Sequence, residues 1–400
     1  MNNYQKIDFL IHPEILQVLE EVRDLDMDDL ELANSRLLRN FSAGQKTAIL
    51  EQRFLRKKSS KKFSFSHQLI FTRLGLEQST REIVSRYKAG KIGQTFSLVA
   101  DLCCGIGGDS FFLQSKVCGV DLDPAILKAY KFNMQRIGKK SIAVRSDVNN
   151  CCIRADMAML DPARRLDRHA KRWDSQNLSP SVPEIQKLIN KYGNMVIKLP
   201  PGMDVPGFLL GGELEYLGVR DDCLELAVWL GGFGRAGHVT ASELESGVSL
   251  SLNRHDVAGT FGNIQSPGKY LYEPVKVLVR SHLFGFLAGE LGLCQIDPGI
   301  AFLSGDRFIK HPMVKPYRIL KELPNNMKTV KKALKEFDIG QITVKKRGSA
   351  INTEYIRKTL NPRGSLPGVL IFTRVMNRKT VFLTEPLLGS VFLDEQSAEP

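Results

Sequence analysis

The chain has 400 residues, of which 43% are hydrophobic and 25% charged, a composition that indicates a globular protein of two to four domains and excludes a disordered one. Met1 to Leu16 lacks a basic stretch followed by an apolar one, and no apolar run approaches about 18 residues, so neither a secretory leader nor a membrane span is expected. The formal net charge of +13 favours a polyanionic partner, although solubility alone could also account for it.

Cysteine usage indicates a reducing compartment. The 7 cysteines include the adjacent pairs Cys103-Cys104 and Cys151-Cys152, and no cysteine and histidine residues stand at zinc-site spacing. We therefore expect buried, reduced thiols, no metal site and a cytoplasmic location.

The first 80 residues predict a helical subdomain. Apolar residues recur with helical periodicity from Pro13 to Leu55, and the basic run from Arg56 to Lys62 follows. Such a run is usually a solvated loop, and the alternative is a loop that contacts phosphates. The segment from Leu69 to Lys88 predicts a loop and then a helix over Arg81 to Tyr87, with Thr80 as its N-cap.

The segment from Leu98 to Arg165 predicts the central sheet of a nucleotide-binding α/β domain, to which we assign residues 81–235. It holds four short apolar runs, and each run ends at or just before an acid. The four acids are Asp101, Asp121, Asp147 and Asp161. After the first run, Gly105, Gly107 and Gly108 predict a tight turn that opens a helix over Asp109 to Ser115. Open α/β sheets bind ligands at the carboxyl ends of their strands, where these acids would gather.

The turn distinguishes between two cofactors. A nicotinamide fingerprint has Gly or Ala where this chain has Ser110, and the D-x-C-x-G-x-G pattern from Asp101 to Gly107 departs from it further. Taken with the strand-end acids and the Asp161-Pro162 step, the pattern resembles class I S-adenosylmethionine-dependent methyltransferases. The resemblance implies a cofactor site formed by Asp101, Cys103, Gly105, Gly107, Asp121, Leu122, Asp147 and Asp161, with S-adenosylhomocysteine as product.

The remaining chain predicts smaller modules. Two apolar runs, Leu214 to Val219 and Leu224 to Trp229, predict a hairpin that closes the catalytic domain near Gly234. Residues 236–338, with a helix expected over Val275 to Leu291, predict an α+β module. Residues 301–400 hold 18 Lys and Arg against 9 Asp and Glu, a surplus of +9 typical of a nucleic-acid-binding appendage. The most concentrated run of basic residues in this segment is Lys345, Lys346 and Arg347. We expect it to lie in a loop that binds RNA.

The motifs from Phe71 onward resemble a narrower family. The Phe71 to Thr80 segment and the stretches DLCCGIGGDS, DLDP, DPARR, VIKLPPG, YLYEP, KKR and GVLIFTR are similar to bacterial class I methyltransferases that carry a THUMP-like C-terminal domain. The resemblance implies an N-terminal helical subdomain (1–80), a Rossmann-like methyltransferase domain (81–235), a ferredoxin-like module (236–338) and a THUMP-like domain (339–400). Because THUMP domains proper bind RNA in tRNA-modifying enzymes, it also implies methylation of tRNA or rRNA.

Two features bear on the methyl acceptor. Asp161 and Pro162 match the fourth-strand motif of enzymes that methylate exocyclic amino groups, whereas Ala163 and Arg164 depart from it and leave stacking to another residue, Trp173 or Tyr192. The DPAR stretch is also similar to uridine-C5 RNA methyltransferases, but the cysteine nucleophile that they need after the fifth strand is absent, because the chain reads Leu199-Pro200-Pro201 there. Arg164 and Arg165 could contact RNA phosphates or pair with Asp161 and Asp167.

Two alternatives of other classes remain open at this point. One is a non-catalytic RNA-binding protein that only holds the cofactor, which the intact set of four acids disfavours. The other is a small-molecule methyltransferase, which would not need two basic appendages. The sequence favours a monomer without fixing the oligomeric state.

Overall fold

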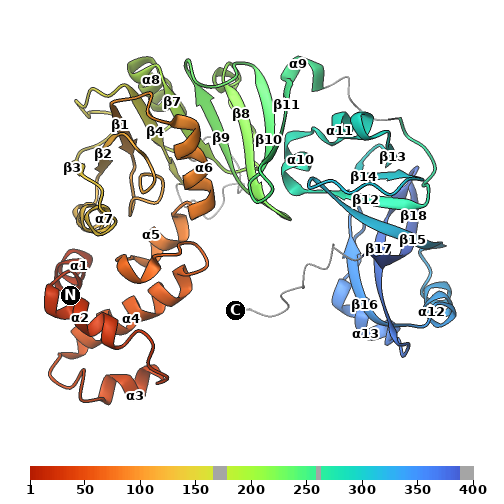
Figure 1. Cartoon of the computed structure of the whole chain (residues 1–400), viewed down its shortest axis with the longest axis horizontal. Helices are drawn as coiled ribbons and strands as arrows, with labels where there is room; N and C mark the ends of the chain where they lie inside the picture. The colour runs from red at the N-terminus through yellow and green to blue at the C-terminus, as the bar shows by residue number, and fades with distance from the viewer. Residues whose placement is uncertain (165–177, 258–262, 388–400) are drawn as a thin grey trace. The chain divides into compact units, whose positions relative to one another are not determined.

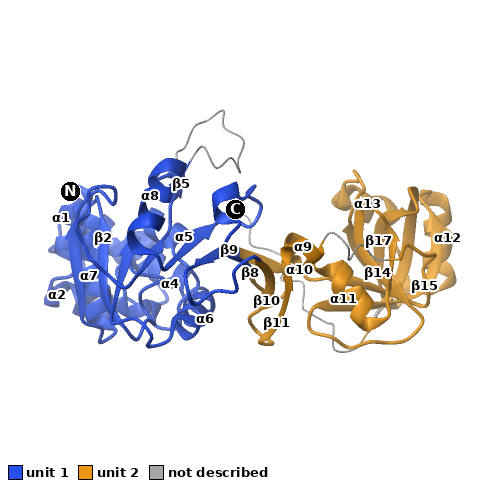
Figure 2. Ribbon diagram, turned by 90° about the horizontal axis from the view of Figure 1, so that it is seen from above, with its two compact units in different colours: residues 1–215, 225–237 blue, residues 216–224, 238–400 orange. Residues whose placement is uncertain are grey.

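The computed structural model describes residues 1–164, 178–257 and 263–387. The chain forms two compact units, Met1–Glu215 with Glu225–Gly237, and Tyr216–Leu224 with His238 onward. Figure 2 colours the two units separately. Among the described residues, no helix is both long and apolar enough to cross a membrane.

The first unit begins with short, well-capped helices. These are α1 (Asn3–Leu10), α2 (Pro13–Glu21), α3 (Asp29–Asn34), α4 (Ala43–Ser59), η1 (Ser66–Gln68), α5 (Arg73–Gln78) and α6 (Glu82–Ile92). Capping boxes at Asn2, Asp28 and Ser42 satisfy the first backbone N–H groups of α1, α3 and α4. Their apolar faces share one core with Ala125 and Ala129 of α7 (Pro124–Arg136). The N-terminal helices are therefore packed onto the sheet domain within the first unit.

A nine-stranded sheet follows, with the order β11-β10-β8-β9-β7-β4-β1-β2-β3 (Figure 1). Its strands are β1 (Leu98–Leu102), β2 (Lys116–Asp121), β3 (Ser141–Arg145), β4 (Met157–Leu160), β7 (Met195–Leu199), β8 (Glu213–Val219), β9 (Asp222–Leu230), β10 (His238–Glu243) and β11 (Val248–Asn253). The strands β3, β2, β1, β4 and β7 run parallel, and β9 pairs antiparallel with β7. Helix α8 (Val182–Tyr192) connects β4 to β7 beyond a small β5 (Ala163–Arg164) and β6 (Leu178–Ser179) pair.

This sheet confirms the predicted α/β class, and it differs from the expectation at two places. It does not close near Gly234 but continues through β10 and β11, and the boundary between the units passes through β8 and β9. The helix expected over Asp109 to Ser115 is a series of turns instead. The side chains of this segment are used in contacts within the protein, because Asp109 pairs with Lys88 and the Ser110 hydroxyl donates to Asp101.

Two further local predictions were wrong. Thr80 does not cap α6, because Arg81 is the N-cap residue and the Thr80 hydroxyl donates to Asp109 instead. The single helix expected over Val275 to Leu291 is two helices, α10 (Lys276–Ser281) and α11 (Phe284–Leu291), because His282 adopts a left-handed conformation with φ 60°.

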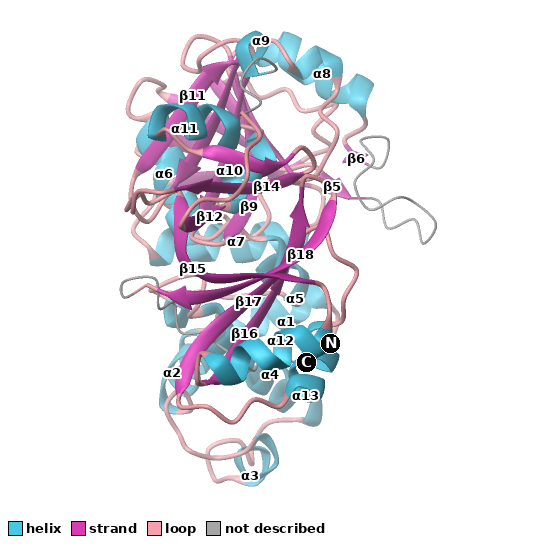
Figure 3. Cartoon of the chain, turned by 90° about the vertical axis from the view of Figure 1, so that its right-hand side faces the viewer, coloured by secondary structure: helices cyan, strands magenta, loops and turns pink. Residues whose placement is uncertain are grey.

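The second unit is organised around a seven-stranded sheet of order β13-β14-β12-β15-β18-β17-β16 (Figure 3). Its elements are α9 (Arg254–Val257), β12 (Tyr270–Pro274), α10, α11, β13 (Cys294–Asp297), β14 (Ile300–Gly305), β15 (Val314–Pro324), α12 (Met327–Glu336), β16 (Ile339–Lys346), α13 (Thr353–Leu360), β17 (Leu366–Val375) and β18 (Arg378–Pro386). Both α12 and α13 bury apolar residues in one core with β15 to β18. The sheet is continuous across the division expected at residue 338, because β18 lies between β15 and β17.

Candidate functional site

The glycine turn after β1 has the backbone that its sequence predicts. Cys103, Gly105 and Gly107 have φ values of 61°, 53° and 98°, in the region that favours glycine. A Cβ atom on Gly107 would lie 2.8 Å from the Phe111 ring, whereas one on Gly105 would meet no atom within 4 Å. The turn is therefore packed on one side and open at Gly105.

Asp101 stabilises this turn through a buried hydrogen bond. Its side chain is buried and accepts a hydrogen bond from the Ser110 hydroxyl, which follows the glycines. Burial raises the pKa of Asp101 to about 7, and the nearby Asp109 carboxylate adds to the effect. Of the cofactor residues predicted from sequence, Asp101 is thus one that fixes the turn.

Asp121 and Leu122 lie beside the open part of the turn. The Asp121 carboxylate accepts the backbone N–H of Gly105 at 3.3 Å and that of Asp123 at 3.0 Å. Burial raises the pKa of Asp121 despite these hydrogen bonds. Leu122 is 63% exposed, so its side chain is accessible beside the turn. At the next strand, Asp147 accepts the backbone N–H of Asn149 at 2.9 Å.

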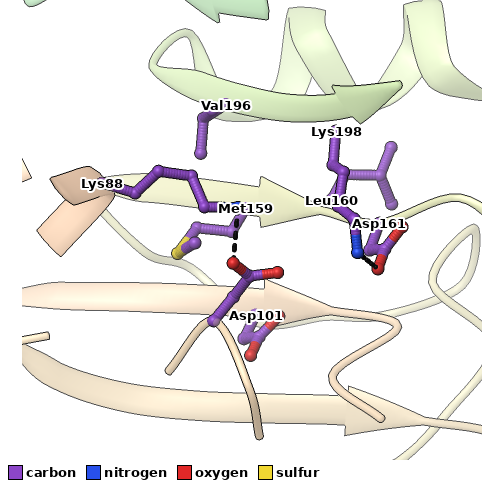
Figure 4. Close-up of a pocket in the computed structure, with 8 residues that line it drawn as sticks. Lys88, Asp101, Met159, Leu160, Asp161, Val196 and Lys198 are labelled. Atoms are coloured by element: carbon purple, nitrogen blue, oxygen red, sulfur yellow. Dashed lines mark hydrogen bonds and ion pairs between the residues drawn. The ribbon is translucent and has the colours of Figure 1, made fainter. Parts of the chain in front are cut away.

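Asp161 follows β4 directly and forms an ion pair that the sequence reasoning missed. Lys198 on β7 donates from Nζ to Asp161 Oδ2 at 2.6 Å (Figure 4). It also donates to the Gln78 carbonyl at the end of α5 at 3.1 Å. The adjacent strands bring the two side chains together, since Leu160 pairs with Ile197. Pro162 is buried next to Asp161.

A second buried cation lies in the same part of the unit. Lys88 of α6 is 1% exposed and contacts both Asp109 and Glu225, the latter at 2.8 Å. Because these carboxylates outweigh the cost of burial, they raise the pKa of Lys88. A sequence signal existed, since Lys88 occupies a core position of α6 beside Val84, Ala89 and Ile92. A lysine at a core position of a helix is rarely buried unless it is paired.

These charged groups line one small pocket, together with apolar side chains of β4 and β7. Its lining consists of Lys88, Asp101, Asp109, Met159, Leu160, Asp161, Val196 and Lys198. Its volume of about 10 Å³ is roughly the room of one water molecule. The pocket is therefore a small gap beside the ion-pair network, and it is too small to hold a nucleotide-sized ligand.

The residues predicted to contact RNA fall into two groups. Lys345 and Lys346 are the last residues of β16, and Lys345 pairs with Glu273 at 2.8 Å while Arg347 lies 3.6 Å from the same carboxylate. Lys345 outweighs the cost of burying Glu273 and lowers its pKa. Arg164 belongs to β5, while Arg165 lies outside the described residues, as does Trp173.

Two sequence-based suggestions, and the thiol of Cys103 in the glycine turn, can be compared with the structure. Tyr192 is buried and donates to the Ile153 carbonyl, so it is not a stacking residue. The basic run is not a free loop, because Arg56 is buried and donates to the Leu69 carbonyl, and Lys62 donates to three carbonyls at the end of α5. Burial raises the pKa of Cys103 to about 12, so this thiol is unsuited to act as a nucleophile at neutral pH. Among the described residues, no cluster of His, Cys, Asp and Glu suits a metal ion.

Comparison with known proteins gives three findings. Residues 314–386 match the family described as "THUMP domain-like". Proteins of two Mycobacterium tuberculosis strains, named as uncharacterized S-adenosylmethionine-dependent methyltransferases, are 29% identical over 332 residues, which cover 80% of this chain and 89% of theirs. A crystal structure from Porphyromonas gingivalis W83, assigned to the methyltransferases, has a TM-score of 0.77 at 18% identity and covers 95% of this chain and 97% of that one.

The comparisons confirm the predicted fold class and enzyme class. The structural likeness extends over almost the whole chain, and the sequence likeness covers 80% of it. The THUMP-like match begins at Val314, before the division expected at residue 339. By homology, the chain is an S-adenosylmethionine-dependent methyltransferase with a THUMP-like domain in its C-terminal part.

Proposed function

We propose that this enzyme methylates a nucleobase of tRNA or rRNA in the cytoplasm, at an exocyclic amino group. The observation that carries the proposal is the Asp161 carboxylate, which is half-buried directly after β4, next to the glycine turn of β1. It is a hydrogen-bond acceptor at the ligand-binding edge of the sheet.

The residues around the glycine turn fit S-adenosylmethionine. The turn is open at Gly105, and the Asp121 carboxylate is already oriented by two backbone N–H groups, so that it could accept the hydroxyls of a ribose. The exposed Leu122 beside it offers an apolar surface for an adenine ring. Cys103, Gly107, Asp101 and Asp147 would complete the cofactor site.

The chemistry requires little of the protein beyond alignment. The bound cofactor supplies a methyl group on a positively charged sulfur, which is already a good electrophile. The protein must direct the lone pair of the acceptor nitrogen at that carbon, and Asp161 can do so by accepting an N–H of the amino group, with the Pro162 carbonyl as a second acceptor. The nitrogen–carbon bond forms as the sulfur–carbon bond breaks, and the nitrogen then releases one proton to Asp161 or to water.

The activity can be tested on RNA taken from cells that lack this gene. The purified protein and tritium-labelled S-adenosylmethionine should label that RNA but not RNA from the parent strain, and mass spectrometry of the nucleosides should identify a methylated amino group. Asp161→Ala should retain cofactor affinity and lose about 100-fold or more in transfer rate. Labelling at uridine C5, or equal turnover by Asp161→Ala, would contradict the proposal.

The THUMP-like domain suggests where RNA binds. Four lysines of α12 are exposed and recur at helical spacing, so they form one basic face: Lys328, Lys331, Lys332 and Lys335. Lys345 and Arg347, in contrast, share the Glu273 carboxylate. We therefore propose that the α12 face contributes more phosphate contacts than the Lys345 to Arg347 run.

Two multiple variants separate these surfaces. Replacing the four α12 lysines with alanine should weaken RNA binding and flatten its salt dependence, by about 0.7 in slope for each phosphate of a single strand that is no longer neutralised. Replacing Lys345, Lys346 and Arg347 should have the smaller effect. Filter binding at several salt concentrations measures both, and a larger effect of the second variant would reverse the assignment.

A further inference from the structure

We infer that Lys198 is a positioning residue for methyl transfer, acting through Asp161 and through the end of α5. This inference rests on the proposed role of Asp161. It assigns a function to a side chain that the sequence motifs leave unexplained, a lysine within the apolar strand β7.

The contacts of Lys198 connect two separate elements at the site. Its Nζ lies 2.6 Å from Asp161 Oδ2 and 3.1 Å from the Gln78 carbonyl, so one ammonium group holds both the end of β4 and the end of α5. The pair is neither fully buried nor fully exposed, with side-chain exposures of 20% for Lys198 and 33% for Asp161. Only one Asp161 oxygen is bound by Lys198, which leaves the carboxylate able to accept a second donor.

The charge of Lys198 is maintained by its surroundings. Burial alone would lower its pKa, but the Asp161 carboxylate, with Asp109 and Glu225, outweighs that cost and raises it. Lys198 is therefore an ammonium ion at neutral pH and has no lone pair with which to accept the proton of the acceptor. Its contribution is to hold the Asp161 carboxylate in place among the other acids of the network.

Lys62 provides a matched comparison at the same helix end. It donates to the carbonyls of Leu76, Glu77 and Ser79 at 2.6, 3.0 and 3.1 Å, beside the Gln78 carbonyl that Lys198 uses. No contact joins Lys62 to Asp161 among the hydrogen bonds and ion pairs of the described residues. Replacing Lys62 thus disturbs the end of α5 without removing either partner of the Lys198–Asp161 ion pair, although it also removes a like charge near Lys198.

The test compares Lys198→Met, Lys198→Arg and Lys62→Met in the full-length chain. With tritium-labelled cofactor and RNA from the deletion strain, Lys198→Met should lower kcat by about 100-fold with little change in KM, because a misplaced acceptor group costs about that much. Lys198→Arg should restore part of kcat, and Lys62→Met should remain within about threefold of the wild type. All three should bind S-adenosylhomocysteine with unchanged affinity in calorimetry, which shows that they are folded.

The outcomes are distinguishable from failure of the proposed function. Equal losses in Lys198→Met and Lys62→Met, or wild-type kcat in Lys198→Met, would overturn the inference. If the wild type labels no RNA, the proposed function fails, and the ion pair is then tested by urea unfolding of Lys198→Met, Asp161→Asn and the double variant. Shifts of the unfolding midpoint that simply add would show that the two side chains are not coupled and would overturn the inference, whereas a double variant no less stable than Lys198→Met alone would show that Lys198 holds the Asp161 carboxylate.

Discussion

In the folded protein, the buried Asp101 side chain keeps its proton at pH values where the same side chain is already ionised in the unfolded chain. Its pKa is raised to about 7 from 3.8, so between these values the folded protein binds more protons and loses stability as pH rises. Asp101→Asn has no proton to lose, and its stability relative to the wild type should rise by up to about 4 kcal/mol between pH 4 and pH 7. Urea unfolding at several pH values measures this, and a difference independent of pH would contradict it.

Asp121 offers a direct test of the cofactor site. Asp121→Ala should raise the Kd for S-adenosylhomocysteine by roughly 10- to 100-fold, the effect of losing charge-assisted hydrogen bonds from a half-buried carboxylate. Asp123→Ala is the matched control, because Asp123 caps α7 through the Ala125 N–H at 2.7 Å and should affect stability more than affinity. Calorimetry that finds equal affinity losses in both variants would remove Asp121 from the site.

The acids at the strand ends could be predicted from sequence, and the lysines paired with them could not. An acid after an apolar run is visible in the sequence, and the topology of parallel strands brings such acids to one edge. Lys88 is buried and Lys198 is half-buried, and each pairs with an acid far away in the sequence, Glu225 for Lys88 and Asp161 for Lys198. The core position of Lys88 in α6 indicates that it needs a partner, but nothing local identifies the partner of either lysine.

At the scale of elements, α5 and α6 each contain one glycine, and the two glycines have opposite environments. A Cβ on Gly75 would lie 2.6 Å from Ile106 in the glycine turn and 2.7 Å from the Thr72 hydroxyl, while one on Gly90 would meet nothing within 4 Å. Gly75→Ala should therefore destabilise the protein by about 1–3 kcal/mol. Gly90→Ala should stabilise it by about 0.5–1 kcal/mol, because alanine favours a helix interior.

Chemical denaturation of the two alanine variants measures this contrast. A stable Gly75→Ala variant would mean that α5 is not tightly packed on the turn. Because that packing is next to the proposed cofactor site, Gly75→Ala should also weaken S-adenosylhomocysteine binding, whereas Gly90→Ala should not.

The elements that sequence reasoning predicted incorrectly share a physical cause. The turns at residues 109–112 replace a helix because side chains of that segment satisfy buried charges, and the break at His282 depends on one left-handed residue. Periodicity reports which face of an element is apolar, but it does not report such tertiary contacts. The apolar strands on either side of the glycine turn were predicted, because their apolar runs follow from burial alone.

At the scale of the whole molecule, the strand order determines where the chain can be cut. A chain that ends after Gly340 lacks most of β16 and all of β17 and β18, so β15 loses one of its two neighbours and the apolar face of α12 loses most of its core. We expect the second unit of this truncated chain to bind an apolar dye and to aggregate.

The same truncated chain should still bind S-adenosylhomocysteine, because the proposed cofactor site lies in the first unit. A chain that ends at Leu387 keeps all seven strands and is the matched control. Cooperative unfolding of the second unit in the shorter chain, measured by calorimetry, would contradict the expectation.

The division of the C-terminal half that was predicted at residue 338 does not reflect the strand order of the seven-stranded sheet. β12 is hydrogen-bonded to β15, and β15 to β18, although more than 60 residues separate Arg318 from Glu385 in one pair of that ladder. The position of a composition change in the sequence carries no information on such pairings. The division of this half into two separate domains, residues 236–338 and 339–400, therefore remains a prediction.

Helix α6 has a consequence for how the protein is made. Lys88 and Lys91 are paired with Glu225, Glu213 and Glu215, which follow them by 137, 122 and 124 residues. At a synthesis rate of about 5–20 residues per second, the ribosome needs roughly 7–27 s to complete the partner strands after α6 has been made. During that interval Asp109, 21 residues after Lys88, is already available to pair with Lys88, whereas Glu213 and Glu215, the two carboxylates that pair with Lys91, have still to be made.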